Sequence, residues 1–349
     1  TADAPFERRD LKTPFPSPAG LAPKSWPRET YYDLVIVSDL GLLGGTRRCN
    51  EGYIAAATAL GMRVGLFHWP RYDLALTSIA DDYRQLSYQP NVDILVREDV
   101  IEADTVLIHH PPILRHAIDA VPTITSRQTA ILVNQLPMQR RSMDPHYYDP
   151  AEAAEVVADR FGTDPLWLPI SPLTRRFMEE IGGFARIAGT DWIPPLGRTA
   201  DPADPPALRR GPSHPFVLGR HSRDHATKWP ATAAALRAAY CAGVPDIDVR
   251  LMGGVRTPKK LLGTLPVNWT AMAFDEVPVD EFLRRTDVFA HFVNDDYIEE
   301  FGRNIAEAMA AGVPTILPPV FRETFGDAAL YCEPDDVAKT VMRLRDDPE

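Results

Sequence analysis

The chain has 349 residues, of which 45% are hydrophobic and 24% charged, as expected of a soluble globular protein with room for two domains. Its formal net charge of -11 argues against a nucleic-acid partner, since binding to a phosphate backbone requires a broad basic face. Neither a membrane-spanning apolar run nor a signal-peptide core is present, and three distant cysteines suggest no disulfide frame: Cys49, Cys241 and Cys332. We therefore expect a cytoplasmic protein.

The first half alternates strand and helix patterns after a proline-rich lead-in at residues 1–30. The apolar, β-branched run 33–38 predicts a buried parallel strand, and the glycine-rich turn 41–46 precedes a helix expected from about residue 47 to 60. A strand at 63–67 completes a βαβ unit. Further strands are expected at 92–96, 105–110, 129–133, 166–170 and 190–194. These patterns predict a Rossmann-like domain over residues 31–195.

Prolines mark the join to a second half. Seven of them lie between Pro194 and Pro215, which predicts a hinge at residues 196–215. Strand patterns return at 216–219, 249–253 and 288–292, with helical patterns at 229–242 and 278–286. The fold class is therefore α/β, with a second Rossmann-like domain at 216–349 and a ligand cleft between the two. The last residues form a helical pattern without a closing cap, as in a piece of a longer polypeptide.

The acidic stretch 294–319 is the most informative part of the sequence. A loop carries Glu299 and Glu300, Gly302 precedes a helix with one apolar face, and Glu307 lies within that helix. The helix N-terminus offers N–H groups and a positive dipole end to phosphate oxygens, and carboxylates accept hydrogen bonds from vicinal hydroxyls. A nucleotide-sugar has hydroxyls on both sides of a diphosphate and would suit this arrangement. The alternative is an amphipathic surface helix with solvated acids.

The residue pattern of this stretch, Glu-Glu-Phe-Gly followed by Glu-Ala-Met-Ala-Ala-Gly, resembles the Glu-x7-Glu signature of retaining GT-B glycosyltransferases of family 4. The resemblance implies a GT-B fold with an N-terminal acceptor domain and a C-terminal donor domain. It implies that Glu299 contacts the donor sugar and that Glu307 holds the ribose. Other residues of the same stretch are expected at the donor: Glu300, Phe301, Gly302 and Arg303.

Two further groups are candidates for the site. Gly44 and Gly45 lie between a strand and a helix, where the backbone could approach a phosphate or sugar, although a tight turn explains them equally well. Arg220 ends a strand and Lys228 follows it, and the resemblance implies that this pair grips the diphosphate. The spacing of the pair is longer than usual, so Arg223 is a substitute for Lys228, and ordinary surface cations remain the alternative.

Two more positions complete the set. His109 and His110 end the strand at 105–110, and the resemblance implies that one histidine contacts the donor sugar; we favour His109, with a packed structural histidine as the alternative. Gly253 ends a strand in the region where the family binds the nucleotide base. The Asp-x-Asp at residues 246–248 directly precedes a strand, and we expect no metal and no cofactor.

The resemblance predicts an enzyme of polysaccharide or glycoconjugate biosynthesis, a hexosyltransferase that moves a sugar from a nucleotide-diphosphate donor to a hydroxyl acceptor. The acceptor would be a glycan, a lipid-linked sugar or a protein, with peripheral membrane contact as a further option. A sugar-nucleotide epimerase or phosphorylase of the same fold, and a non-catalytic module of a larger protein, are the alternative functions.

Overall fold

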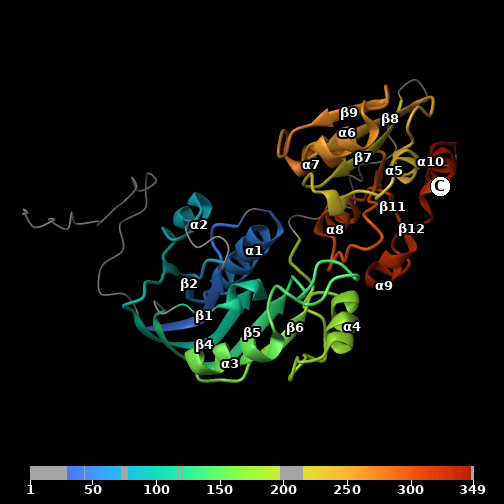
Figure 1. Ribbon diagram of the computed structural model, residues 1–349. Helices are drawn as coiled ribbons and strands as arrows, with labels where there is room; N and C mark the ends of the chain where they lie inside the picture. Colours follow the sequence, from blue (N-terminus) through green and yellow to red (C-terminus); the bar gives the residue numbers. More distant parts are fainter. Residues whose placement is uncertain are drawn as a thin grey trace, which may run out of the picture. The chain divides into compact units, whose positions relative to one another are not determined.

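The computed structural model describes residues 30–42, 44–71, 78–116, 118, 121–196 and 215–346. The chain forms two compact units, each built on a six-stranded sheet (Figure 1). The lead-in expected at 1–30 and the hinge expected at 196–215 lie outside the described residues, apart from Thr30, Leu196 and Pro215. Within the described ranges no helix combines the length and the apolar character needed to cross a bilayer.

The first sheet has the strand order β3-β2-β1-β4-β5-β6. Its strands are β1 Tyr31–Ser38, β2 Val64–His68, β3 Val92–Ile94, β4 Val100–His109, β5 Thr123–Val133 and β6 Leu166–Pro169. The central strand β1 pairs in parallel with both β2 and β4. Because β1 is flanked by strands whose connections run in opposite directions along the sheet, the switch point of this Rossmann-like topology lies between β1 and β4.

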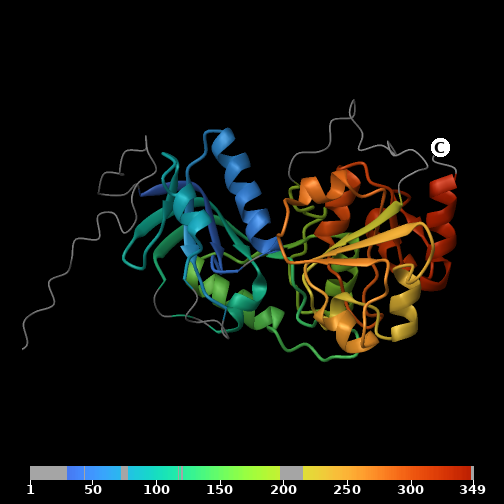
Figure 2. The same ribbon diagram turned by 90° about the horizontal axis from the view of Figure 1, so that it is seen from above.

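Helices cover both faces of this sheet. They are α1 Gly45–Ala59, α2 Asp81–Leu86, the 3-10 helix η1 Pro111–Arg115 and α3 Pro150–Phe161. Ile54 of α1 and Tyr83 of α2 pack with Ile36 and Leu66 of the sheet in one buried cluster, while α3 packs against β5. Figure 1 shows α1 and α2 on one side of the sheet and α3 on the other, and Figure 2 shows α1 from above.

The second sheet repeats the topology. Its order is β12-β11-β10-β7-β8-β9, which is the order of the first sheet when its strands are counted from β7, and all five pairs are parallel. The strands are β7 Phe216–His221, β8 Ile247–Met252, β9 Trp269–Met272, β10 Val288–Ala290, β11 Thr315–Leu317 and β12 Leu330–Tyr331. The switch point of this sheet lies between β7 and β10.

Two apolar clusters enclose the second sheet. Val288 and Ala290 of β10 face a cluster that includes α5 Ala233–Ala239, α6 Arg256–Leu262 and α10 Val337–Asp346. Phe289 faces the other way, toward α7 Val279–Arg284 and α8 Arg303–Ala310. This alternation is expected of a strand covered on both faces. The unit also contains α4 Pro172–Ile181, α9 Arg322–Phe325 and the 3-10 helices η2 Ala226–Lys228, η3 Pro319–Phe321 and η4 Pro334–Asp336.

The two units are not two consecutive halves of the sequence. Residues 134–147, 169–182 and 189–196 precede the expected hinge, yet they belong to the unit that contains the second sheet. Backbone bonds explain part of this grouping, since Ile298 N–H donates to Gln139 O at 3.0 Å and Arg141 N–H to Asp296 O at 2.8 Å. The expected boundary at residue 195 therefore differs from the division seen in the structure.

The α/β class and both Rossmann-like sheets are confirmed, whereas one expected strand is wrong. Residues 190–194 form no strand, although Trp192 N–H donates to Pro169 O at 2.7 Å. Pro194 and Pro195 lie at the end of this stretch and have no N–H group that could continue the hydrogen bonding of a strand.

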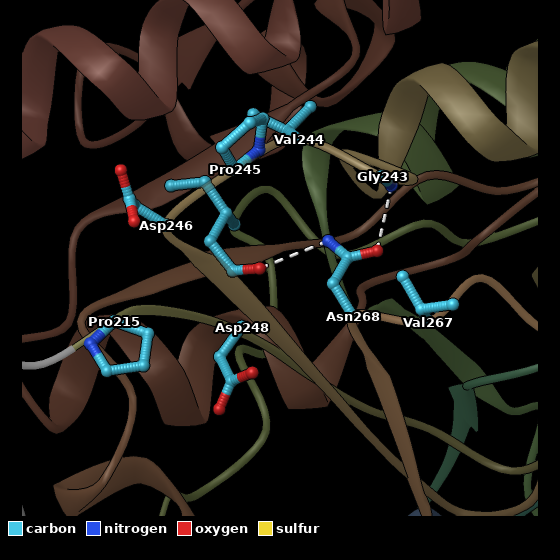
Figure 3. Close-up of a pocket in the computed structure, with 9 residues that line it drawn as sticks. Pro215, Gly243, Val244, Pro245, Asp246, Asp248, Val267 and Asn268 are labelled. Atoms are coloured by element: carbon cyan, nitrogen blue, oxygen red, sulfur yellow. Dashed lines mark hydrogen bonds between the residues drawn. The ribbon is translucent and has the colours of Figure 1, made fainter.

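A pocket of about 360 Å³ lies at the amino ends of β7, β8 and β9 (Figure 3). It is lined mostly by the loops that enter these strands, and Asn268 fixes two of them. The Asn268 amide donates to Ile247 O at 3.1 Å and accepts from Gly243 N–H at 2.8 Å. Since ligands of open α/β sheets bind beyond the carboxyl ends of the strands, this pocket lies at the opposite edge from a conventional site.

Candidate functional site

The carboxyl ends of β7 and β10 bring the candidate residues of the second unit together. Arg220 and His221 end β7, and His291 directly follows β10. The loop after His291 carries Glu299 and leads into α8, which begins at Arg303 and contains Glu307. The switch point of the second sheet thus holds both glutamates of the predicted signature within one compact unit.

Glu299 is the centre of a buried charged cluster. Its Oε2 forms a short ion pair with Lys228 Nζ and lies 3.5 Å from His291 Nε2. The Lys228 ammonium also lies 4.7 Å from the centre of the Tyr297 ring. Burial alone would raise the pKa of Glu299, but the Lys228 charge and the His291 contact outweigh burial and lower it to about 2. Glu299 is therefore an anion at neutral pH.

Glu307 has a different environment, with its side chain about one quarter exposed. Arg303 Nε donates to Glu307 Oε1 at 2.8 Å, an i,i+4 pair along α8, and His221 Nε2 lies 3.8 Å from Oε2. Burial lowers the pKa of His221 to about 3, with His291 and Arg220 acting in the same direction, so His221 is neutral. Glu307 therefore carries a charge that is partly open to solvent beside a neutral imidazole.

Gly302 makes the turn that starts α8. Its φ of 76° lies in the left-handed region, and a Cβ there would come 2.7 Å from Ile305 Cδ1. Ile305 and Ala306 N–H both donate back to Gly302 O, and Phe301 is buried next to Phe325. The Phe-Gly pair thus has a local explanation. Phe301 packs in the apolar interior, and Gly302 adopts the positive φ required at the start of α8.

Arg220 is fully buried. Its guanidinium carbon lies 3.5 Å from the centre of the Trp229 ring, and Nη2 donates to Lys228 O at 2.6 Å. Burial lowers the pKa of Arg220, while Tyr240, Asp224 and Glu299 oppose that shift. In this structure Arg220 braces the loop that carries Lys228, and Lys228 is the cation that touches the Glu299 carboxylate.

The loop after Arg220 is held by Asp224 and by two glycines of the next strand end. The Asp224 carboxylate accepts from Trp229 Nε1 at 3.1 Å and from Arg256 N–H at the start of α6. Gly253 has a φ of 117°, and a Cβ on it would lie 2.0 Å from Ser222 O. Its N–H and that of Gly254 both donate to Met272 O. Gly253 is thus required by the close approach of the 222–224 loop, and its N–H is used within the fold.

Glu300 faces a different part of its unit from Glu299. Its Oε1 accepts from Gln135 Nε2 at 3.0 Å and Leu136 N–H at 3.3 Å, and its backbone carbonyl accepts from the hydroxyls of Ser171 and Thr174. Burial, reinforced by the Glu299 charge, raises the pKa of Glu300 to about 8. Adjacent carboxyls therefore differ in charge at neutral pH, because only Glu299 has a cation partner.

In the first unit, His109 ends β4 at the switch point of its own sheet. Its Nδ1 lies 2.7 Å from Asn50 Oδ1, and Asn50 Nδ2 donates to Tyr83 Oη at 3.1 Å. The amide oxygen can only accept, so His109 carries its proton on Nδ1. Burial lowers its pKa to about 3, which makes His109 a neutral group suited to hydroxyl contact rather than to proton transfer at neutral pH. His110 follows it in the left-handed region, with a φ of 81°.

Gly44 directly precedes α1 and Gly45 is its first residue, in the connection that follows β1. His109 ends β4, the strand next to β1 at the switch point. Gly44 has a φ of 86° and precedes α1, and a Cβ on either glycine would meet no atom within 4 Å among the described residues. The buried Asp39 orders the preceding turn by accepting from Gly41 N–H and Arg71 N–H, each at 2.9 Å. The left-handed conformation explains Gly44, whereas neither crowding nor positive φ explains Gly45.

No protein-family model and no curated protein sequence matches the chain. Among solved structures, the glycosyltransferase from Rickettsia africae ESF-5 matches with a TM-score of 0.51 and 14% identity over 90% of this chain and 88% of that one. The two parallel six-stranded sheets with their covering helices are the two Rossmann-like domains of a GT-B glycosyltransferase. The chain has the GT-B fold.

Two other glycosyltransferase structures are less similar. The lipopolysaccharide-biosynthesis glycosyltransferase WaaG gives a TM-score of 0.46 at 12% identity, over 82% of this chain and 81% of that one. TarM gives 0.48 at 12% identity over 70% of this chain, which spans about half of TarM (48%). At these identities the likeness concerns the fold alone.

Three side chains of this GT-B chain that lie at the candidate site are not among the residues predicted from the sequence. His291 and His221 each direct Nε2 toward one of the two glutamates, and Asn304 on α8 contacts both histidine residues. Their positions offered a signal, because His221 and His291 stand at the carboxyl ends of two strand patterns. Asn304 lies in the helix that contains Glu307, where a polar residue next to apolar positions is expected on the solvated face of the helix.

Proposed function

We propose that this chain is a retaining glycosyltransferase that moves a hexose from a nucleotide-diphosphate donor to a hydroxyl of a glycan, a lipid-linked sugar or a protein. The observation that carries the proposal is the arrangement of Glu299 and Glu307 on the two sides of the α8 N-terminus, at the switch point of a parallel sheet. The GT-B fold favours this chemistry, and the proposal rests on the side chains at the switch point because a fold by itself does not assign a function.

The donor diphosphate would bind at the first turn of α8, where N–H groups and the positive end of the helix dipole attract phosphate oxygens. Lys228 supplies a cation in an otherwise acidic protein. As the bond between sugar and phosphate breaks, negative charge grows on the leaving phosphate. A cation and helix N–H groups already in place stabilise that charge without having to reorganise.

Glu307 would accept hydrogen bonds from the ribose hydroxyls, and Glu299 from a hydroxyl of the donor sugar. Glu307 suits ribose because it is partly exposed and already oriented by Arg303. Glu299 is an anion paired with Lys228, so it stabilises the nearby positive charge that develops on the sugar ring. Phe301, Gly302 and Arg303 shape the helix start, and the donor needs no metal in this proposal.

The first unit would contribute His109 and the Gly44-Gly45 turn as donor contacts and would bind the acceptor. His109 is neutral at neutral pH because burial lowers its pKa to about 3, and its Nε2 would accept a hydrogen bond from a sugar hydroxyl. Glu300 and Gly253, which the fold already uses internally, would support the loops that meet the donor. The cytoplasmic location remains part of this proposal.

The decisive experiment incubates the protein with a panel of sugar nucleotides and measures free nucleotide, with and without a hydroxyl acceptor. Acceptor-dependent release, with an α-linked product from an α-linked donor by NMR, supports the proposal. Interconversion of sugars without nucleotide release would instead reveal an epimerase. If calorimetric titration with uridine and guanosine diphosphates and their sugars detects no binding, the chain is a non-catalytic module.

Glu307→Gln tests the ribose contact directly. Loss of two charge-assisted hydrogen bonds should weaken nucleotide binding about ten-fold or more. Glu281→Gln is the matched control, because Glu281 on α7 also forms an i,i+4 ion pair, with Arg285 directly after that helix at 2.6 Å. Equal nucleotide affinity in the wild type and Glu307→Gln would remove the basis of the proposal.

A further inference from the structure

Asn304, the second residue of α8, links the two strand ends at the site. Its Nδ2 lies 3.0 Å from the backbone oxygen of His221 and 2.9 Å from His291 Nδ1. A backbone carbonyl can only accept a hydrogen bond, so the Asn304 amide must present its NH2 group, and not its oxygen, to His221. The second hydrogen of the same NH2 group is then directed at His291.

This orientation fixes the tautomer of His291. Because Asn304 donates to Nδ1, that nitrogen must be the acceptor, and the proton of the neutral ring is on Nε2. His291 is fully buried, stacked against Phe289 at an interplanar angle of 9° and edge-on to Phe321. Its Nε2 lies 3.5 Å from Glu299 Oε2 and makes no shorter hydrogen bond within the described chain.

We propose that Asn304 is a positioning residue that holds His291 in the Nε2–H form and thereby directs a neutral N–H donor at the Glu299 carboxylate. The Lys228 ammonium and the His291 N–H both approach Oε2 of Glu299. Oε1 is then the oxygen that accepts from a donor-sugar hydroxyl. The structural part of this inference is independent of the proposed function, whereas its effect on turnover rests on it.

The surroundings keep His291 neutral rather than cationic. Burial lowers its pKa to about 4, and Arg220 and Lys228 act in the same direction against the opposing effect of Glu299. His221 is the other titratable group coupled to it. A neutral donor matters, because a cationic His291 would add a second full charge next to Lys228.

The tautomer can be measured without any substrate by nitrogen-15 NMR of histidine-labelled protein at pH 7, with the His291 signals identified by their loss in His291→Gln. The expected wild-type spectrum has the proton on Nε2 of His291. In Asn304→Asp the carboxylate can only accept, so the proton should move to Nδ1 or the ring should become doubly protonated. Asn304→Ser, which is too short to reach Nδ1, serves if the Asp variant does not fold.

Asn268→Asp is the matched control. The Asn268 amide also donates to two backbone carbonyls, Cys241 O at 2.9 Å and Ile247 O at 3.1 Å. Asn268 lies at the amino ends of the strands, in the pocket that Figure 3 shows. This variant should lose stability without changing the His291 signals. A wild-type His291 with its proton on Nδ1, or an unchanged His291 spectrum in Asn304→Asp or Asn304→Ser, would overturn the proposal.

Turnover supplies the second readout. Under the proposed function, Asn304→Ser should lower kcat about ten-fold or more while the affinity for uridine or guanosine diphosphate changes little, because the misplaced group faces the sugar and not the nucleotide. Unchanged kcat in Asn304→Ser would refute the positioning role. Absence of turnover in the wild type would refute the proposed function, and the NMR measurement would still decide the role of Asn304.

Discussion

The Arg220 guanidinium lies over the Trp229 ring, 3.5 Å from the ring centre. It also donates to two backbone carbonyls, Lys228 O at 2.6 Å and Ser222 O at 3.5 Å. Three contacts of one side chain therefore shape the loop that presents the Lys228 ammonium to Glu299. A residue expected from its sequence position to touch a diphosphate is enclosed by the protein, and its main effect should be on the loop and on stability.

Arg220→Lys should lower the free energy of unfolding by about 3 kcal/mol, because a lysine cannot reach both carbonyls and leaves a buried charge poorly paired. Urea denaturation measures this change. Arg223→Lys is the control, since Arg223 is exposed on the same loop. A stable Arg220→Lys variant with a large loss of diphosphate affinity would show instead that the guanidinium binds the ligand directly.

Glu300→Gln should stabilise the protein in mildly alkaline solution. The folded-state pKa of Glu300 is raised to about 8, so its contribution to stability is complete below the unfolded pKa of about 4.5 and is lost as pH rises through 8. An amide keeps the oxygen that accepts from Gln135 and Leu136 but cannot ionise. The urea midpoint of the variant should exceed that of the wild type at pH 9 by more than at pH 6, and an equal difference at both values would contradict the assignment.

His109→Gln should weaken the acid sensitivity of the protein. His109 has a folded-state pKa of about 3, so the unfolded chain takes up a proton that the folded chain refuses, and stability falls as pH drops from about 6.5 toward 3. Removing one such group should reduce the slope of stability against pH by up to about 1.4 kcal/mol per pH unit in that window. The exposed His116 provides the control substitution, and equal slopes in His109→Gln and wild type would exclude this origin.

Gly253→Ala should destabilise the second unit severely, by about 3 kcal/mol or more, because the new Cβ would overlap the Ser222 backbone oxygen at a positive φ. Gly263→Ala separates the two causes. Gly263 also has a positive φ, of 78°, but has open space around its Cβ position, so that substitution should cost about 1 kcal/mol. Thermal unfolding of both variants measures the difference, and similar losses would show that backbone conformation alone decides the cost.

Much of the architecture could be predicted because buried parallel strands are continuous apolar runs, and β1, β7 and β10 are of this kind. Two helices that were missed carry readable caps: Asp149 accepts from Ala151 and Glu152 N–H before Pro150, and Ser171 accepts from Thr174 N–H before Pro172. Aspartate or serine directly before proline is typical of a helix N-terminus, so both helix starts are marked in the sequence.

The sequence predicts where a candidate site lies, but not the contacts that its side chains make. The Glu-x7-Glu spacing predicts that both glutamates lie near the N-terminus of one helix. No local sequence pattern indicates that Glu299 pairs with Lys228, 71 residues away. Neither the burial of Arg220 nor the opposite charge states of Glu299 and Glu300 follows from sequence spacing, because each depends on which distant side chain occupies the neighbouring space. Asn304 could not be recognised for the same reason, because its two partners, His221 and His291, lie at the carboxyl ends of two distant strands.

The second compact unit includes residues 134–147 and 169–182, which lie far before its own sheet in the sequence, so the unit cannot be isolated by cutting the chain once. Translation started at residue 215 would yield a polypeptide in which the Glu300 backbone oxygen lacks the hydroxyls of Ser171 and Thr174, and residues 296–298 lack the partners at 139–142. Such a fragment would expose unsatisfied polar groups beside the loop that carries Glu299. Genetic separation of the second unit therefore requires circular permutation or co-expression with the missing stretches, not simple truncation.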